Sequence, residues 1–219
     1  MRIEQKGTSI YISELMTSPD KIKIPSQMFP LVGQGSYLLH NENTSPLPTN
    51  AETDAIREVF DEMHPRLGSC YSNTDALIGA LRKRGIDAKS MVGWLFIGDN
   101  FPIHHCFSVI EKYHAVLDFS VRASFFQELN QNSTDMQTLR KEFSRIYNEV
   151  LQSKMNSEIG TFGQMDSGCI MLAAVCSPHA GAATFAKLRK AFPKHPALVQ
   201  TDASGATMTQ QIVLEQMKR

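Results

Sequence analysis

A helix-length segment that ends at a glycine, followed by three strand-length apolar runs, constrains this fold most. Residues 70–84 carry apolar side chains at helical spacing, and Gly85 stands where helices commonly end. The runs at residues 88–97, 103–110 and 114–121 are rich in Val, Ile, Leu and Phe, with only short turns between them. Turns this short join antiparallel strands, because parallel strands need a long crossover. The pattern predicts a helix packed on an antiparallel sheet, an α+β fold.

The segments on either side have weaker patterns. Residues 1–49 look irregular because prolines interrupt them, and only residues 9–12 favour a short strand. A helix is predicted to begin after Thr49 or Asn50, either of which can cap it, and to end before Pro65. Further on, the sequence predicts a glycine-rich loop at residues 157–168 and helices at residues 124–152, 178–192 and 207–219.

Length and composition favour a single domain. The chain has 219 residues, within the usual size range of one domain. No internal repeat or low-complexity segment divides it. We expect one domain at residues 1–219, made of a core at about residues 50–121, an irregular segment at residues 1–49 and a mainly helical extension at residues 124–219.

Charge and hydropathy disfavour two classes of partner. Lys and Arg together number 22, as do Asp and Glu, so the formal net charge is zero. The electrostatic attraction that supplies most non-specific affinity for nucleic acids is therefore missing. No run approaches the ~20 apolar residues that cross a bilayer, and the N-terminus lacks the apolar run of a signal peptide. We expect no nucleic-acid or membrane partner and a cytoplasmic location, with delivery into another cell as the open alternative.

The cysteines form no pattern of disulfides or zinc ligands. Cys70, Cys106, Cys169 and Cys176 are dispersed, no Cys-x-x-Cys pair occurs, and the histidines lack zinc-ligand spacing. The sequence therefore predicts reduced thiols, no bound metal and no cofactor. Reduced thiols are available for chemistry as nucleophiles.

Cys70 stands at the predicted start of a helix. Unpaired backbone N–H groups and the positive end of the helix dipole meet there, and both favour a thiolate over a thiol. The same N–H groups can hold the oxyanion that forms when a thiolate attacks a carbonyl. Cys70 is therefore the candidate nucleophile, and it requires an imidazole to carry the proton and a carboxylate to orient the imidazole.

The predicted hairpin supplies both partners. If it turns at residues 112–113, Asp118 lies diagonally across from His105 and within side-chain reach of it. Because side chains alternate between the two faces of a strand, these two residues share one face, whereas His104 points to the other. We therefore predict that His105 and Asp118 complete a catalytic triad with Cys70.

These residues belong to a longer series: Cys70, residues 81–86 (LRKRGI), residues 93–94 (GW), His105 and residues 117–118 (LD). The order resembles the transglutaminase-like branch of the papain-like cysteine enzymes, over roughly residues 50–121. The resemblance implies a papain-like core in which Cys70 attacks an amide carbonyl, His105 transfers the proton and Asp118 orients the imidazole. The chain departs from the family at its usual His-Ala-Trp, which reads His-Cys-Phe here.

Three further residues are candidate substrate contacts: Asn73, one helical turn beyond the cysteine, Trp94 and His104. Each also has a structural interpretation, since Asn73 suits a solvated helix surface and Trp94 suits an apolar core. The same holds for two members of the triad. His105 also fits a satisfied strand histidine, and Asp118 also fits a carboxylate at a strand end.

Together these features predict a thiol-dependent acyl-transfer enzyme, and the resemblance implies that it acts on amide bonds of peptides or proteins. A peptidase, a glutamine deamidase and a transglutaminase share the same acyl-enzyme, so the sequence leaves these three activities open. The side chain of the oxyanion hole also stays open between His64 and Gln34, and His64 equally suits a contact with carbonyls at a helix end. The alternative from another class is a non-catalytic binding or adaptor module on the same fold, with Cys70 as a packed residue. The sequence assigns no oligomeric state.

Overall fold

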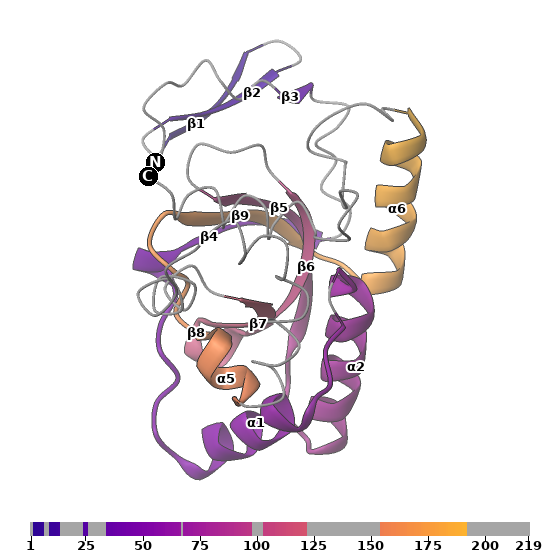
Figure 1. Cartoon of the computed structure of the whole chain (residues 1–219). Coiled ribbons are helices and arrows are strands. Elements are labelled where there is room, and N and C mark those ends of the chain that lie inside the picture. Colours follow the sequence, from indigo (N-terminus) through magenta and orange to yellow (C-terminus); the bar gives the residue numbers. More distant parts are fainter. Residues whose placement is uncertain are drawn as a thin grey trace, which may run out of the picture.

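The computed structural model describes residues 2–6, 9–13, 24–25, 34–66, 68–97, 103–121 and 154–191. This part of the chain is α+β, with helices around a six-stranded sheet and a separate three-stranded sheet (Figure 1). Neighbouring strands run antiparallel in both sheets. The predicted α+β class with an antiparallel sheet is therefore confirmed.

The larger sheet comprises β4 (Gln34–His40), β5 (Lys89–Ile97), β6 (Ile103–Ile110), β7 (Ala115–Val121), β8 (Gly160–Gly163) and β9 (Cys169–Val175). The smaller sheet comprises β1 (Arg2–Lys6), β2 (Ser9–Ser13) and β3 (Ile24–Pro25). The helices are α1 (Ala51–Glu62), α2 (Cys70–Lys83), α5 (Asn156–Ile159) and α6 (Pro178–Ala191), with short 3-10 helices η3 (Asn41–Asn43) and η4 (Glu111–Tyr113). The larger sheet has the strand order β4-β9-β5-β6-β7-β8.

The larger sheet bends along β6, so that β4, β9 and β5 lie across from β7 and β8 (Figure 1). Helix α2 runs beside β6, and α6 lies on the same side, farther along the strand (Figure 1). Helices α1 and α5 lie near β7 and β8. None of the helices in the described part of the chain is long and apolar enough to span a membrane.

The predicted meander is confirmed in its bounds and in its register. Strands β5, β6 and β7 agree with the three predicted apolar runs to within one residue at each end. Val109 pairs with Val116 and Ile110 with Ala115, which is the register that a turn at residues 112–113 predicts. The connection is the 3-10 helix η4 rather than a two-residue turn, and it closes at His114 with φ of 50°.

Helices α1 and α2 share one apolar core with β6 and β7. Its buried members include Ile56, Val59, Phe60, Leu77, Leu81, Ile110, Leu117 and Phe119. Leu77 and Leu81 of α2 are thus buried as the helical spacing predicts, but Ala76 is exposed. Thr74 is buried in its place, and its hydroxyl donates a hydrogen bond to the Cys106 carbonyl at 3.1 Å. This contact ties the first half of α2 directly to β6.

In the larger sheet, three strands lie where the sequence did not predict them, and β1 and β3 of the smaller sheet were not predicted either. Strand β4 falls within the segment expected to be irregular, and β9 lies between β4 and β5 in the sheet. The prediction of a loop at residues 157–168 is wrong, because α5 and β8 occupy most of it. Strand β9 shows no apolar alternation because the sheet buries residues on both of its faces, including Met171 and Ala174. The sheet therefore draws on chain outside residues 50–121.

The remaining helix predictions divide into two groups. Helix α1 is confirmed, and Asn50 caps it by accepting a hydrogen bond from the Thr53 amide at 3.0 Å. Helix α6 confirms the helix predicted at residues 178–192. The helices predicted at residues 124–152 and 207–219 lie outside the described residues.

Candidate active site

The site lies where β6 and β7 part. Their ladder has three pairs and ends at Ser108 opposite Leu117. Beyond that point β6 stays paired with β5 as far as Ile103, whereas β7 is paired with β8 through Asp118 and Thr161. Backbone hydrogen bonds therefore give way to side chains between the two strands, and a polar pair bridges them.

That pair consists of His105 and Asp118. The His105 Nε2 and Asp118 Oδ2 atoms are 2.7 Å apart, and the two side chains are 5% and 15% exposed. The other carboxylate oxygen, Oδ1, accepts a hydrogen bond from the Ser120 amide at 3.0 Å. Both oxygens of Asp118 are thus held, so the carboxylate presents a fixed oxygen to the imidazole.

Cys70 is the first residue of α2, and its thiol is free and partly exposed. Its side chain lies close enough to the His105 ring to help raise the pKa of that imidazole. Because Nε2 of that ring faces Asp118, Nδ1 is the ring nitrogen left for the thiol. The structure therefore brings together the three residues predicted as a triad, with the imidazole between the thiol and the carboxylate.

Electrostatics favour a charged imidazole at this position. Burial lowers the pKa of His105, but the charge and hydrogen bond of Asp118, together with Cys70, outweigh burial and raise that pKa to about 10. The pKa of Asp118 is lowered, because the charge and hydrogen bonds of His105 and Ser120 outweigh the opposing effect of burial. An imidazolium between a thiol and a carboxylate can stabilise a thiolate and later donate a proton.

The other three thiols lie in less favourable surroundings. Burial raises the pKa of Cys106 and of Cys176. Burial, aided by the charges of Asp166 and Asp118, raises the pKa of Cys169 to about 12. These environments favour the neutral thiol, which is a poor nucleophile.

Two of the residues predicted to contact substrate, Trp94 and His104, lie on the opposite face of the sheet from His105. His104 and Trp94 are buried at 2% and 0% exposure, and the His104 ring contacts Tyr71 and Phe185 on the opposite face of β6 from His105. These two are corrected to core positions, because Trp94 of β5 pairs with His104 of β6 and side-chain alternation along both strands directs the two rings to the same face.

Asn73 makes contacts within the protein, and the prediction that it contacts substrate stays a prediction. Its side-chain oxygen accepts a hydrogen bond from the Arg66 amide at 3.0 Å, and its side-chain nitrogen donates to the Arg66 carbonyl at 2.8 Å. Both contacts fix the loop that precedes α2. Ser69 occupies the N-cap position of α2, but its side chain makes no capping hydrogen bond.

The two side chains proposed for the oxyanion hole are both exposed. Gln34 begins β4, which β9 and β5 separate from β6. His64 follows the end of α1. Among the described residues, no group of His, Cys, Asp and Glu side chains is arranged to hold a metal ion.

Sequence reasoning did not single out Ser120 or Tyr71. Ser120 follows Asp118 by two residues, and a carboxylate that accepts from the amide two residues on is a common local motif, so a signal was present. Tyr71 follows the cysteine and hydrogen-bonds Nδ1 of His104. No spacing rule predicts that contact, because it depends on how α2 packs against β6.

Comparisons with protein-family models, with curated proteins and with solved structures find no match for this chain. No relative therefore supplies a substrate, a partner or the role of a residue. Function has to be inferred from the contacts within the site.

Proposed function

We propose that this protein is a thiol-dependent acyl-transfer enzyme that acts on amide bonds of peptides or proteins, on a papain-like or transglutaminase-like core. The observation that carries the proposal is a single buried imidazole, that of His105, hydrogen-bonded to Asp118 through Nε2 and near enough to Cys70 for that residue to help raise its pKa. A nucleophile, a base and an orienting carboxylate in this order are what nucleophilic acyl transfer requires.

In the first half-reaction the Cys70 sulfur attacks the carbonyl carbon of an amide, and its proton resides on Nδ1 of His105. The carbonyl π electrons move to oxygen as the carbon–sulfur bond forms. The imidazolium then gives its proton to the nitrogen of the leaving amine, and the carbon–nitrogen bond breaks. The products are an amine and a thioester on Cys70.

In the second half-reaction an acceptor attacks the thioester. His105 takes the proton of the acceptor and returns it to the sulfur as the carbon–sulfur bond breaks. Water as acceptor gives a peptidase or a glutamine deamidase, and an amine gives a transglutaminase. All three activities use the same triad, so an activity assay has to identify the acceptor.

The start of α2 supports stabilisation of the oxyanion. Cys70 is the first helical residue, and Ser69 does not cap the helix with its side chain. Backbone N–H groups in the first turn of a helix lack partners within the helix and carry the positive end of its dipole. The oxyanion of the tetrahedral intermediate that forms on Cys70 lies next to these groups, where each donor is worth several kcal/mol, about 2.7–4 in a well-studied protease.

The first test is selective alkylation. Iodoacetamide at about pH 6 is expected to modify Cys70 at least about tenfold faster than Cys169, which is also partly exposed and so serves as the reference thiol. Peptide mass spectrometry reads each site separately. In the His105→Ala variant this preference is expected to disappear. Equal rates at Cys70 and Cys169 in the unmodified protein would contradict an activated thiolate and favour a binding module.

The second test is activity. The purified protein, Cys70→Ala and Cys169→Ala are compared on a casein-type protein, on a glutamine peptide with ammonia detection, and in an amine-incorporation assay. At least one assay is expected to respond to the unmodified protein and to Cys169→Ala but not to Cys70→Ala. Absence of activity in all three, together with a slow Cys70, would overturn the proposal.

A further inference from the structure

Two neighbouring pairs connect the start of α2 with β6. Cys70 and Tyr71 are consecutive on α2, and His104 and His105 are consecutive on β6. Cys70 meets His105, and Tyr71 meets His104. Because consecutive strand residues point to opposite faces, the His104 and His105 rings lie on opposite faces of β6, and the start of α2 contacts both rings.

The second contact is a hydrogen bond between the Tyr71 hydroxyl and Nδ1 of His104. Burial, aided by the charge of His105, lowers the pKa of His104 to about 3. The ring is therefore neutral, with Nδ1 as acceptor and the tyrosine hydroxyl as donor. Burial also raises the pKa of Tyr71 far above its ordinary range, with smaller contributions from the charges of nearby cysteines. Neither partner changes charge between about pH 5 and about pH 8.

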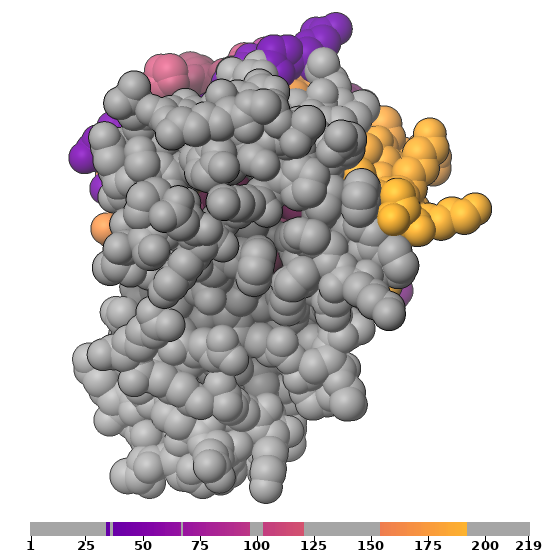
Figure 2. All heavy atoms as spheres, turned by 90° about the horizontal axis from the view of Figure 1, so that it is seen from above, coloured from indigo at the N-terminus to yellow at the C-terminus, as the bar shows by residue number. Residues whose placement is uncertain are grey.

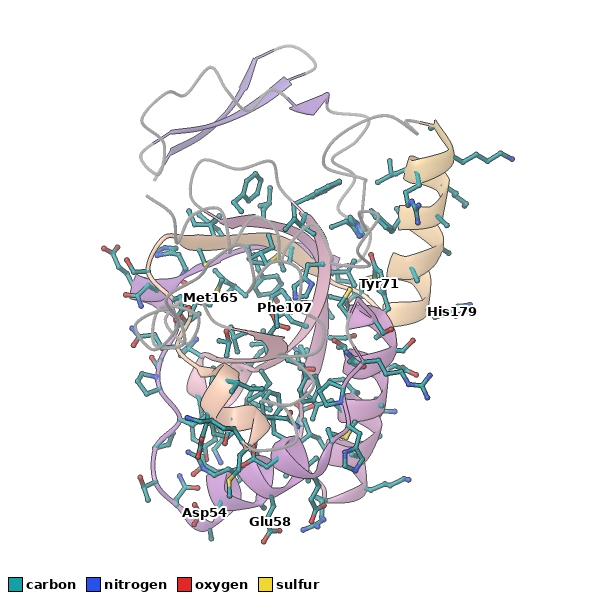
Figure 3. The ribbon with its side chains drawn as sticks, in the orientation of Figure 1. Asp54, Glu58, Tyr71, Phe107, Met165 and His179 are labelled. Atoms are coloured by element: carbon teal, nitrogen blue, oxygen red, sulfur yellow. The ribbon has the colours of Figure 1, made fainter. Side chains whose placement is uncertain are left out.

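Aromatic rings and α6 enclose this hydrogen bond. The Phe185 ring stacks on His104 with centroids 4.9 Å apart, and the Trp94 ring meets it edge-on at 4.9 Å. At Gly181 of α6 an added Cβ would lie 3.1 Å from the Tyr71 ring, so α6 approaches this ring closely. Tyr71 lies between α2 and α6, on the other side of β6 from Phe107, and α6 lies at the edge of the face seen from above (Figures 2 and 3).

We infer that Tyr71 and His104 are positioning residues whose hydrogen bond sets the separation of α2 from β6 and thereby holds the Cys70 sulfur against His105. This inference rests on the proposed function and deepens it. Tyr71 touches no reacting atom and acts through its neighbour in the chain. A shift of about 1 Å at a reacting pair can cost about a hundredfold in rate, so a fixed separation at this point matters to the reaction.

The environment of the pair suits such a role. The bond joins the hydroxyl of the half-buried Tyr71 to the buried His104 ring. Such a hydrogen bond between neutral groups is directional, and a missing partner leaves a buried acceptor unsatisfied. Apolar packing alone, by contrast, tolerates small displacements of a helix end. The hydroxyl therefore adds a distance constraint that Phe185 and Trp94 do not supply.

The test uses the rate of Cys70 alkylation by iodoacetamide as a function of pH, together with turnover of a responsive substrate. Tyr71→Phe deletes the hydroxyl and keeps the ring. It is expected to slow Cys70 alkylation at about pH 6 by about tenfold and to shift the midpoint of its pH profile, with Cys169 unchanged. Tyr113→Phe is the matched control, because it removes a hydroxyl that donates to Glu52 at 2.6 Å, on α1 and away from the site. It is expected to behave as the unmodified protein.

Two comparisons separate positioning from general packing. His104→Gln retains an amide oxygen that can accept a hydrogen bond from Tyr71. Cys70 is therefore expected to be alkylated faster in His104→Gln than in His104→Leu. Phe185→Leu keeps the hydrogen bond, so it is expected to lower the thermal midpoint with no change in the pH profile. If Tyr71→Phe does not fold, the rates of Cys70 alkylation in His104→Gln and His104→Leu test the positioning role in its place.

The outcomes distinguish this inference from the proposal on which it rests. One outcome is that Cys70 is alkylated rapidly in the unmodified protein and that Tyr71→Phe does not change the pH profile of its alkylation. That outcome overturns the positioning role and leaves the proposed enzymatic function standing. Equal rates for His104→Gln and His104→Leu, or a Phe185→Leu profile shifted as far as that of Tyr71→Phe, also overturn it. A Cys70 that reacts no faster than Cys169 in the unmodified protein overturns both.

Discussion

Two adjacent histidines on β6 experience opposite electrostatics on the two faces of one strand. His104 is 2% exposed and His105 is 4% exposed, so burial penalises the charged form of both rings. Burial lowers the pKa of His104 to about 3. At His105 the interactions with Asp118 and Cys70 overcome burial, and the pKa rises to about 10. The charge of each imidazole is therefore decided by its interaction partners and not by how deeply the ring is buried.

The contrast shows how one strand serves two purposes. On the His104 face a neutral ring, a tyrosine and two aromatic neighbours form part of the packing beneath α2 and α6. On the His105 face a carboxylate converts an equally buried ring into a cation beside a thiol. A slip of one residue in a strand exchanges its faces, so the register of β6 decides which histidine meets the cysteine.

The largest effect is expected when the partner that distinguishes the two rings is removed. Asp118→Asn replaces a charge by an amide of the same shape, so burial should dominate at His105 and its pKa should fall below the ordinary value. The precedent in serine proteases is a loss of about 10⁴-fold in turnover. Turnover and an NMR titration of the His105 ring measure the two consequences. A ring that stays charged at neutral pH in Asp118→Asn would show that another group holds its proton.

The next largest effect concerns stability and the opposite side of the sheet. Leu77 of α2 is 1% exposed in the core shared with α1 and β6. Leu77→Ala should lower the free energy of unfolding by about 2–5 kcal/mol, because it leaves a cavity. Urea denaturation measures this change. In the folded fraction, the preference of iodoacetamide for Cys70 over Cys169 should persist. A change under about 0.5 kcal/mol would mean that this face is not core.

The two histidines should also shape the stability of the protein on opposite sides of about pH 6.5. His104 has a folded pKa of about 3, below the ordinary 6.5, so its contribution is complete above pH 6.5 and is lost as pH falls toward 3. His105 has a folded pKa of about 10, above the ordinary 6.5, so its contribution is complete below pH 6.5 and is lost as pH rises toward 10. On each side of pH 6.5, the free energy of unfolding can change by about 1.4 kcal/mol per pH unit. These two slopes are the acidic and basic limbs of its pH profile.

Urea unfolding at a series of pH values separates the two limbs. His104→Gln should flatten the acidic limb between about pH 6.5 and about pH 4.5, above the range in which carboxylates titrate. His105→Gln should flatten the basic limb between about pH 6.5 and about pH 8, below the range in which most thiols titrate. If either variant flattened the other limb, the charge states assigned to the two faces would be exchanged.

The sequence predicts the parts of the site that short connections determine. A tight hairpin fixes its own register, so the placement of His105 and Asp118 on one face follows from the position of the turn alone. Gly85 and the spacing of Leu77 and Leu81 similarly locate α2. Cys70 is consequently predictable as the residue that begins this helix.

Other parts depend on contacts between distant segments. Strand β9 pairs with β4 and β5, which lie far from it in sequence, and its burial on both faces removes the alternation that marks a strand. The contact between Tyr71 and His104 has the same origin. It exists because the core around Leu81 and the Thr74 hydroxyl fix α2 against β6. The spacing of Leu81 predicts a buried helix face, but no local sequence pattern predicts which strand that face meets.

The smallest effect tests how completely Asp118 accounts for the orientation of His105. The Ser120 hydroxyl lies 3.4 Å from His105 Nε2, at the long end of hydrogen bonding, whereas the Ser120 amide holds Asp118 Oδ1 at 3.0 Å. Ser120→Ala removes the first contact and keeps the second. Turnover should fall by only about 2- to 10-fold, the value of one weak hydrogen bond of about 0.5–1.5 kcal/mol. The pH profile of Cys70 alkylation should stay unchanged, because the charge beside the ring is still present. A loss near that of Asp118→Asn would mean that the hydroxyl shares the orienting role, and the contrast between the two faces of β6 would then rest on two partners rather than one.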